Sequence, residues 1–306
     1  MPRKIIIDTD PGTDDAVAIL LAFAAQELEV LGLVAVAGNL PLGVTERNAR
    51  ALCELAGRSE VPVYAGCARP ILRAPVTAEH VHGPGGLGDL ALPPPKMALR
   101  PEHGVDFLIE ALRREPAGAV TLCALGPLTD IAIALVKAPD IAGQIAALVL
   151  MGGADKPRST VSPVAEFNIH ADPVAAAIVF DSAVPITMIP MDVTQQAINT
   201  PERVAAVRAL GNRCGEAAAA MMTRERRGQF NPPLHDPCVI AYLLEPEIFE
   251  GSPVNVAVET GSALTLGMTV IDWRNVTGRQ PNATVIHKID VDGYYRLLTD
   301  RLAGLP

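Results

Sequence analysis

The sequence predicts an α/β protein: one domain with a doubly wound, open, Rossmann-like sheet of mostly parallel strands and helices on both faces. Short β-branched or apolar runs alternate along the chain with amphipathic, Ala- and Leu-rich segments. The short runs are apolar at nearly every position, as strands of a parallel sheet are when both faces are covered. Neither a Ser/Gly-rich linker nor a block of charge divides the chain, so we expect residues 1–306 to form a single domain.

The predicted elements alternate along the chain. Strands are indicated by continuous runs of Ile, Val, Leu and Ala, and helices by apolar residues that return every three or four positions. The Pro- and Gly-rich stretch His82–Pro95 is predicted to be a long loop, and such loops are often functional. In chain order, the predicted strands are Lys4–Ile7, Val30–Ala37, Val120–Leu125, Ala146–Met151 and Pro185–Pro190. The predicted helices are Asp14–Gln26, Thr45–Ala56, Leu128–Val136 and Asp172–Phe180.

Polar or glycine-containing clusters follow each predicted strand. In open parallel sheets, ligands bind outside the carboxyl ends of the strands. Segments that are distant in the sequence can therefore converge on one pocket at that edge of the sheet. The clusters are Asp8–Asp15, Gly38-Asn39, Gly126, Gly152-Gly153 and Asp192.

Composition excludes several classes of partner. The formal net charge of −9 argues against nucleic acid and anionic membranes, because both require basic patches. The five cysteines are widely spaced, without a CxxC pair, so neither a zinc site nor a disulfide framework is indicated. Reduced cysteines and the lack of a charge-free stretch of membrane-spanning length favour a cytoplasmic location and no membrane partner.

Four carboxylates fall within the stretch DTDPGTDDAVAIL, at Asp8, Asp10, Asp14 and Asp15. Acids at a helix N-terminus can cap the helix, which accounts for Asp14 and Asp15 but leaves the other two unexplained. Buried carboxylates are costly unless they are paired or bound to a cation, and after Lys4 no basic residue lies nearby. The stretch therefore predicts a site for a hard divalent cation, calcium or magnesium.

Two known metal-binding motifs resemble this stretch in part. An EF-hand loop requires Gly at its sixth position and Glu at its twelfth, where a count from Asp8 finds Thr13 and Ile19. Phosphatases of the haloacid-dehalogenase type also begin with DxD after a strand, but they carry Thr or Val where this chain has Gly12. A metal-dependent phosphatase of the DxD type therefore stays open as an alternative function.

The stretch DTDPGTDDAVAIL resembles the DxDxxxDD signature of the inosine–uridine-preferring nucleoside hydrolases. Further segments are similar to those of this family, occur in the same order and extend over nearly the whole chain. They are Ala37-Gly38-Asn39, His80-Val81-His82-Gly83, Gly86-Leu87-Gly88, Leu125-Gly126-Pro127-Leu128-Thr129, Met151-Gly152-Gly153, Ala165-Glu166-Phe167-Asn168, Leu234-His235-Asp236-Pro237-Cys238 and Thr277-Gly278-Arg279.

The resemblance implies calcium-dependent hydrolysis of the N-glycosidic bond of nucleosides to free base and ribose, by an enzyme that assembles as a homodimer or homotetramer. The calcium ligands would be the side chains of Asp10, Asp15 and Asp236 and the backbone carbonyl of Leu125. Asp10 would also take the proton from the attacking water. Asp8 would support this loop without binding the ion itself.

The resemblance also implies a nucleoside-binding pocket. His235 would assist the leaving base, and His82 would lie near the base. Phe167 and Met151 would form an apolar floor. The ribose would be bound by Asp14, Asn39, Glu166 and Asn168, because carboxylates and amides suit vicinal hydroxyls.

The sequence departs from the family at two places. Ser159-Thr160 replaces the usual Gly-Asn pair, so the contact to the ribose 5′-hydroxyl would fall to Thr160. The segment Met221–Phe230 carries arginines where relatives often present tyrosines to the base. Aromatic residues make up 4% of the chain, which gives little material for a purine clamp and favours a broad or pyrimidine-leaning specificity. The change at Thr160 also leaves open a non-catalytic nucleoside- or ribose-binding protein.

Overall fold

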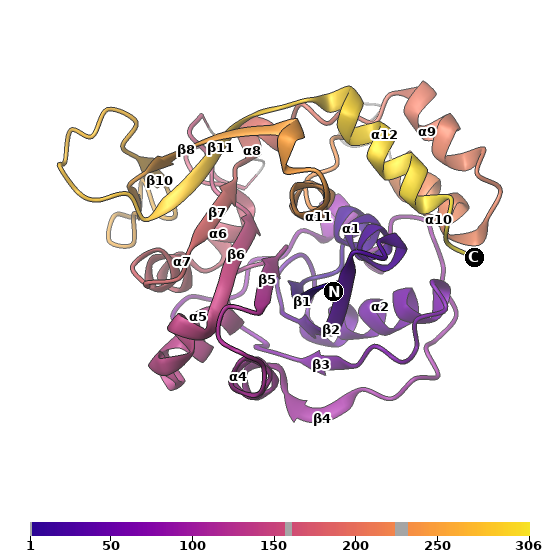
Figure 1. Ribbon diagram of the computed structural model, residues 1–306, viewed down its shortest axis with the longest axis horizontal. Helices are drawn as coiled ribbons and strands as arrows, with labels where there is room; N and C mark the ends of the chain where they lie inside the picture. The colour runs from indigo at the N-terminus through magenta and orange to yellow at the C-terminus, as the bar shows by residue number, and fades with distance from the viewer. Residues whose placement is uncertain (1, 157–160, 224–231) are drawn as a thin grey trace.

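The computed structural model describes residues 2–156, 161–223 and 232–306. Within these residues, nine strands form one sheet in the order β4-β3-β2-β1-β5-β6-β7-β11-β8, and β9 and β10 form a separate antiparallel ribbon (Figure 1). All neighbours in the main sheet are parallel except β8, which pairs antiparallel with β11 at one edge. The strands are β1 (Arg3–Thr9), β2 (Leu28–Ala35), β3 (Val63–Ala65), β4 (Arg100–His103), β5 (Val120–Ala124), β6 (Ile145–Met151), β7 (Ile186–Ile189), β8 (Phe249–Val254), β9 (Val256–Val258), β10 (Thr269–Ile271) and β11 (Ala283–Ile289).

Helices cover both faces of the sheet. Helices α1, α2, α10, α11 and α12 lie on one side of the sheet in Figure 1, and α4, α5 and α7 lie on the other. The helices are α1 (Thr13–Ala24), α2 (Leu42–Leu55), α3 (Glu79–His82), α4 (Gly104–Arg114), α5 (Thr129–Lys137), α6 (Phe167–Ala171), α7 (Pro173–Phe180), α8 (Met191–Thr194), α9 (Pro201–Arg208), α10 (Arg213–Met222), α11 (Pro237–Leu244) and α12 (Val291–Leu302), with 3₁₀ turns at Pro139–Gln144 and Pro246–Ile248.

The first strand shows why its sequence is apolar at successive positions. Side chains of a strand alternate between the two faces of its sheet. Ile5 and Ile7 are fully buried in the core beneath α1, whereas Ile6 is fully buried in the core on the opposite face. The two separate cores confirm the predicted doubly wound sheet.

The strand order reverses at β1. Strands β2, β3 and β4 lie in sequence order on one side of β1. The next strand, β5, lies on the other side of β1, where Asp8 is paired with Ala124. A reversal of this kind opens a crevice at the carboxyl ends of the two central strands, which is where ligands bind in doubly wound folds. The acidic stretch after β1 therefore begins at the topological switch point.

The predicted elements agree with the structure to within a few residues at each end. All five predicted strands and all four predicted helices are present. The predicted loop begins at His82, the last residue of α3, and residues 83–95 contain neither helix nor strand. No helix in the described part of the chain is both long and apolar enough to cross a membrane.

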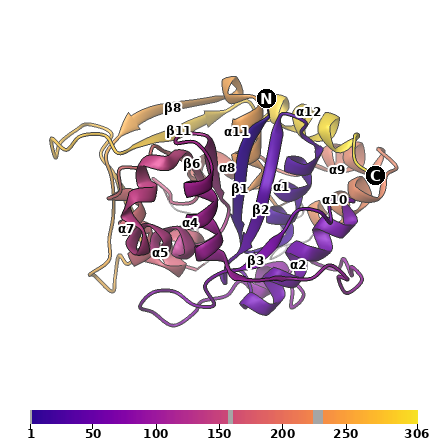
Figure 2. The same ribbon diagram turned by 60° about the horizontal axis from the view of Figure 1, so that its bottom comes forward.

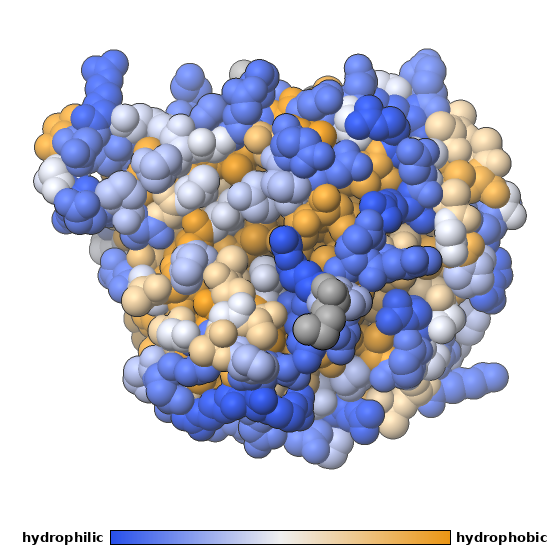
Figure 3. Space-filling model, in the orientation of Figure 1, coloured by the Kyte–Doolittle hydropathy of each residue, from blue (hydrophilic) through white to orange (hydrophobic). Residues whose placement is uncertain are grey.

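The β9–β10 ribbon and its loops project from the body of the molecule beside β8 and β11 (Figures 1 and 2). Polar and apolar residues are mixed on the surface of this projection, at the upper left of Figure 3. Its exposed apolar side chains are Leu264, Val270, Trp273 and Val276.

Candidate active site: a buried acidic cluster

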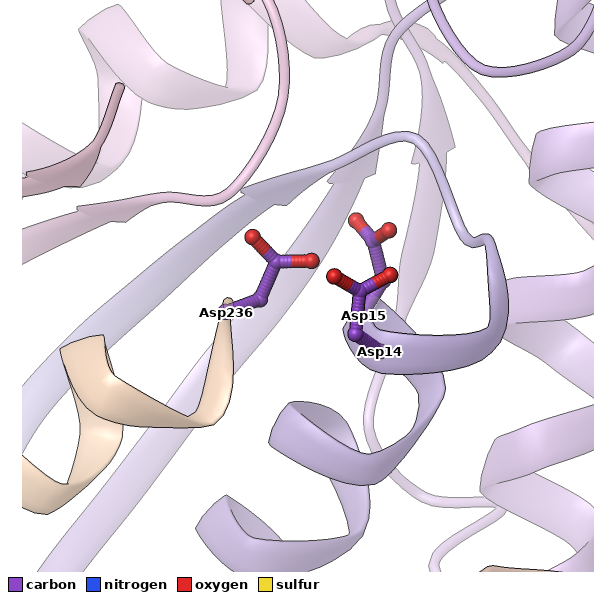
Figure 4. A group of neighbouring side chains, drawn as sticks. All are labelled: Asp14, Asp15 and Asp236. Carbon is purple, nitrogen blue, oxygen red and sulfur yellow. The ribbon is translucent and has the colours of Figure 1, made fainter. Parts of the chain in front are cut away.

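Three carboxylates meet where two helices begin. Asp14 and Asp15 lie in the first turn of α1, and Asp236 immediately precedes α11. One carboxylate oxygen from each residue lies within 4.8 Å of the others. Figure 4 shows Asp236 facing the other two side chains across the gap between the helices. The fold thus joins acids that are more than 220 positions apart in the sequence.

Asp15 is fixed by hydrogen bonds within the loop between β1 and α1. Its Oδ2 accepts from the Gly12 amide at 3.0 Å, and its Oδ1 accepts from the Thr9 hydroxyl at 2.7 Å and from the Asp10 amide at 3.2 Å. The Asn39 side-chain amide donates to Asp15 Oδ2 at 3.2 Å. Asp15 therefore closes the loop as a helix cap while it faces Asp236.

Asp10 lies next to the three clustered acids, in a tightly packed space. Its Oδ2 accepts from the Asn39 amide at 2.6 Å, and its Oδ1 is buried without a hydrogen-bond partner. A Cβ at Gly38 would lie 2.1 Å from Asp10 Oδ2, and a Cβ at Gly126 would lie 2.5 Å from Oδ1. The glycines that follow β2 and β5 are therefore needed to make room for this carboxylate.

Burial and mutual repulsion disfavour the charged forms of these acids. The pKa of Asp10 and the pKa of Asp236 are raised well above the usual range, chiefly by burial and then by neighbouring carboxylates. Burial, followed by the charge of Asp14, also raises the pKa of Asp15, to about 6. A bound cation would lower these pKa values because it stabilises the charged carboxylates.

The donor set fits a hard metal ion. All the side-chain donors are carboxylate oxygens, the preferred ligands of calcium and magnesium. The unpartnered Oδ1 of Asp10 is one further oxygen that a cation could satisfy. The backbone carbonyl of Leu125 accepts from Asn168 Nδ2 at 2.7 Å and retains a second lone pair. Together, these residues could bind a metal ion.

Two predicted ribose-binding residues form a second polar group at the ends of β5 and β6. Glu166 precedes α6 and accepts from the amides of Asn168 and Gly153, at 2.9 Å and 3.0 Å. The Asn168 side chain donates to the carbonyls of Leu125 and Met151, and so connects the ends of the two strands. Burial raises the pKa of Glu166 to about 7.

The raised pKa of Glu166 predicts a pH-dependent stability. Between its usual pKa of 4.5 and about 7, the folded protein holds the Glu166 proton more tightly than the unfolded chain does. This contribution is therefore fully present below pH 4.5 and is lost as the pH rises through 7. Glu166→Gln removes it, so the stability of the variant relative to wild type should rise by up to about 3 kcal/mol between pH 5 and 8. Urea unfolding in the presence of a chelator measures this difference, and a constant difference across this range would contradict the prediction.

The two predicted site histidines are held through the same ring nitrogen. His82 Nδ1 lies 3.1 Å from the Thr13 amide, at the first residue of α1, and 4.0 Å from Asp14 Oδ1. The ring packs so closely on Gly12 that a Cβ there would lie 2.6 Å from Nδ1. His235 Nδ1 lies 2.7 Å from the hydroxyl of Thr194 in α8. His82 is buried and His235 is half-buried.

A small pocket that is partly open to solvent adjoins the acidic cluster at Asp14. Among its described lining residues, His82 supplies the only aromatic ring. The pocket places Asp14 next to Asn199, which follows α8, next to Met221 in the last turn of α10, and next to residues 232–234, which precede α11. Its lining consists of Thr13, Asp14, Val81, His82, Asn199, Met221, Pro232, Pro233 and Leu234.

The remaining predicted site residues have different surroundings. Met151 is buried at the end of β6, and Phe167 is half-buried at the start of α6. Thr160 and most of the segment Met221–Phe230 lie outside the described residues. Asp192 does not face the acidic cluster; its carboxylate accepts from the amides of residues 155 and 156, at 2.7 Å and 2.8 Å, in the loop after β6.

Asp8, predicted to support the acidic loop, contacts a residue that the sequence does not single out. It is buried beside Asp130 of α5, and the pKa of Asp8 is raised by burial and by the Asp130 charge. Asp130 Oδ1 accepts from the Cys67 amide at 2.7 Å.

Thr13, Asn199 and Thr194 were also missed by sequence reasoning. Only their positions after predicted strands or before helices could have indicated them.

A doubly wound sheet with an acidic cluster at its switch point defines an α/β protein with a candidate metal-ion site. Residues 5–296 match the family model described as inosine-uridine preferring nucleoside hydrolase. The pyrimidine-specific ribonucleoside hydrolase RihA of Escherichia coli K12 is 41% identical over 309 residues, which cover 99% of each chain.

The chain also superposes closely on solved structures of nucleoside hydrolases. The purine-preferring ribonucleoside hydrolase from Gardnerella vaginalis superposes with a TM-score of 0.90 and 32% identity, covering 98% of each chain. A plant nucleoside hydrolase, PpNRh1, superposes with a TM-score of 0.91 and 30% identity, covering 99% of each chain. The chain belongs to the inosine-uridine preferring nucleoside hydrolase family. It is a hydrolase of N-glycosyl bonds that acts on nucleosides.

Proposed function

We propose that the protein is a calcium-dependent ribonucleoside hydrolase with a broad or pyrimidine-leaning specificity, which releases the free base and ribose. The observation that carries this proposal is the acidic cluster at the switch point of the sheet. Asp14, Asp15 and Asp236 converge there beside Asp10, and the hydrogen bonds that hold Asp10 and Asp15 come from amides and one hydroxyl. Carboxylates packed in this way require a cation to remain charged.

Asp10, Asp15, Asp236 and the carbonyl of Leu125 would hold the calcium ion, and the proximity of Asp14 makes it a further candidate ligand. When bound, calcium would lower the pKa of a coordinated water and grip the ribose hydroxyls. Asp10 would accept the proton of the attacking water, because its carboxylate is fixed by the Asn39 amide and has one oxygen without a protein partner.

The ribose would lie between the acidic cluster and the residues at the ends of β5 and β6. Asp14 and Asn39 would bind it from one side, and Glu166 and Asn168 from the other. The positive charge that grows on the ribose in the transition state would be stabilised by the surrounding carboxylates. Met151 and Phe167 would form the apolar floor of the pocket, and Thr160 would contact the 5′-hydroxyl of the ribose.

The base would occupy the pocket beside Asp14 and His82. In its described lining, no Phe, Tyr or Trp is available to stack on a large bicyclic base. RihA, which is pyrimidine-specific, is 41% identical to this chain, and the purine-preferring enzyme from Gardnerella vaginalis is 32% identical. Both observations favour uridine and cytidine over inosine and adenosine. Assembly as a homodimer or homotetramer and a cytoplasmic location stay predictions.

The assay that tests the function is release of reducing sugar from uridine, cytidine, inosine and adenosine with calcium present. We expect turnover of uridine or cytidine at a kcat/KM at least equal to that of either purine nucleoside. Higher kcat/KM for the purine nucleosides would overturn the specificity, and no release from any of the four would overturn the function. Tight binding without release would instead support a nucleoside-binding protein.

A further inference from the structure

The β9–β10 ribbon contacts the loop that follows β6 through one threonine. Thr269, the first residue of β10, is buried, and so is its partner in the loop, Ala154. The Thr269 hydroxyl accepts from the Ala154 amide at 2.9 Å and donates to the Ala154 carbonyl at 2.8 Å. An amide can only donate and a carbonyl can only accept, so both directions are fixed. One hydroxyl therefore satisfies both main-chain groups of a buried residue.

The peptide unit between Gly153 and Ala154 is also held by α8. Its carbonyl, which belongs to Gly153, accepts from the Met191 amide at 2.9 Å. Gly153 has a φ of +74°, and a Cβ there would lie 2.3 Å from the Met188 side chain. The loop therefore requires glycine, whose backbone can adopt many conformations. Because glycine does not fix the loop by itself, its conformation depends on the contacts from Met191 and Thr269.

The conformation of this loop affects one of the predicted ribose-binding residues. The Gly153 amide donates to the Glu166 carboxylate at 3.0 Å. The amides of Asn168 and Ile169, in α6, donate to the same carboxylate at 2.9 Å and 3.3 Å. Glu166 is thus held both by its own helix and by the loop after β6. A shift of this loop would displace the carboxylate.

The turn before β10 packs on the segment that carries Glu166. A Cβ at Gly267 would lie 3.0 Å from the His170 Cα and 3.3 Å from the Ala165 Cβ, and Gly267 has a φ of +80°. Glycine adopts this conformation without strain and allows the close approach. Gly267 and Thr269 therefore support, from one short stretch of the ribbon, the two segments that meet at the Glu166 carboxylate.

We propose that Thr269 is a positioning residue for ribose binding, which acts on Glu166 through the loop after β6. This inference rests on the proposed function, in which Glu166 binds the ribose. Without the Thr269 hydroxyl, the amide and the carbonyl of Ala154 are buried without this partner, and the loop must move to regain hydrogen bonds. Glu166 then loses the placement that ribose binding and catalysis require.

The test compares Thr269→Val with Thr269→Ser on uridine and p-nitrophenyl riboside. Valine has the shape of threonine without the hydroxyl, and serine retains the hydroxyl. The two substrates carry the same ribose and different leaving groups. We expect Thr269→Val to lower kcat/KM about tenfold or more and to raise KM about threefold or more, by equal factors on both substrates. Thr269→Ser should stay within about threefold of wild type.

Ser182→Ala is the matched control. The Ser182 hydroxyl has the same kinds of partner, because it accepts from the Val184 amide at 3.3 Å and donates to the Val179 carbonyl at 2.6 Å. Ser182 precedes β7, at the opposite edge of the sheet from the candidate site. We expect its kinetic constants to stay within about twofold of wild type. If urea unfolding shows that Thr269→Val does not fold, Thr269→Ala compared with Thr269→Ser isolates the hydroxyl in the same way.

Three kinetic results would overturn the role of Thr269. They are unequal losses on the two substrates, an unchanged KM in Thr269→Val, and a loss of the same size in Thr269→Ser. The first would place the effect at the leaving group, the second would indicate a smaller folded fraction, and the third would assign the effect to packing.

Calorimetric titration with ribose, in the presence of calcium, tests the same role without catalysis. Thr269→Val should bind ribose about threefold or more weakly than wild type and Thr269→Ser do, and equal binding by all three would overturn the role. If the wild type cleaves neither substrate, the proposed function fails, and the titration still decides the role of Thr269. If the wild type also binds no ribose, both proposals are overturned.

Discussion

Replacing Asp10 by Asn is expected to lower kcat for uridine hydrolysis by about a thousandfold or more. The amide has the size of the carboxylate, and its oxygen can still accept from the Asn39 amide, which holds Asp10 at 2.6 Å. It cannot take a proton from water, and it contributes no negative charge to the cluster. The loss should therefore appear in kcat, measured as reducing sugar released under saturating uridine.

Asp130→Asn is the matched control. Asp130, in the first turn of α5, is also a fully buried aspartate, but its carboxylate contacts the Cys67 amide and Asp8 instead of the cluster. We expect this variant to keep kcat within about threefold of wild type, because removal of a buried carboxylate does not by itself affect the reaction. Equal losses in Asp10→Asn and Asp130→Asn would contradict the catalytic role of Asp10.

Removal of divalent metal is expected to abolish turnover and to destabilise the fold. Without a cation, the raised pKa values of Asp10, Asp15 and Asp236 oppose the charged forms that the reaction requires. A chelator should lower turnover by about a hundredfold or more, and added calcium should restore it. Calcium at a hundred times its dissociation constant contributes about 2.7 kcal/mol to stability, so the melting temperature should rise by several degrees.

Magnesium serves as the comparison ion in this experiment. The stripped protein should regain nucleoside hydrolysis with calcium more fully than with magnesium. It should release no phosphate from phosphoesters with either ion, because the family of the chain acts on N-glycosyl bonds. Full activity in the presence of the chelator would contradict the metal dependence. Phosphate release with magnesium would support the DxD phosphatase instead.

The sheet and its flanking helices could be predicted because their signal is local. Ile5, Ile6 and Ile7 are apolar in succession because each face of β1 has its own core. This pattern can be recognised from the sequence of β1 alone. The position of the site was predictable for the same reason. The polar residues after each strand meet wherever the strands end together, at the reversal between β1 and β5.

The contacts within the site could not be predicted in the same way. Asp14 and Asp15 are neighbours in one helical turn, and whether both face Asp236 depends on where α11 begins, at Pro237. Asp8 belongs to the same acidic stretch, yet its side chain is buried next to Asp130. Its position inside β1 turns it toward a different part of the interior, because side chains alternate along a strand.

Thr194 shows a second limit of sequence reasoning. The resemblance to nucleoside hydrolases points to His235 and Asp236 through their motif, but Thr194 lies 41 positions earlier in a short helix. A single buried threonine carries no periodicity or charge that would distinguish it from a core residue. Its contact with His235 becomes visible only when the distance of its hydroxyl from that ring is known.

The proposed catalysis depends on a doubly charged ion among the acids that follow β1. A crystal grown with calcium, with anomalous scattering recorded for that ion, tests this dependence most directly. We expect one calcium ion per chain, about 2.3–2.6 Å from oxygens of Asp10, Asp15 and Asp236. Anomalous density elsewhere, or none at this position in a crystal saturated with calcium, would contradict the account.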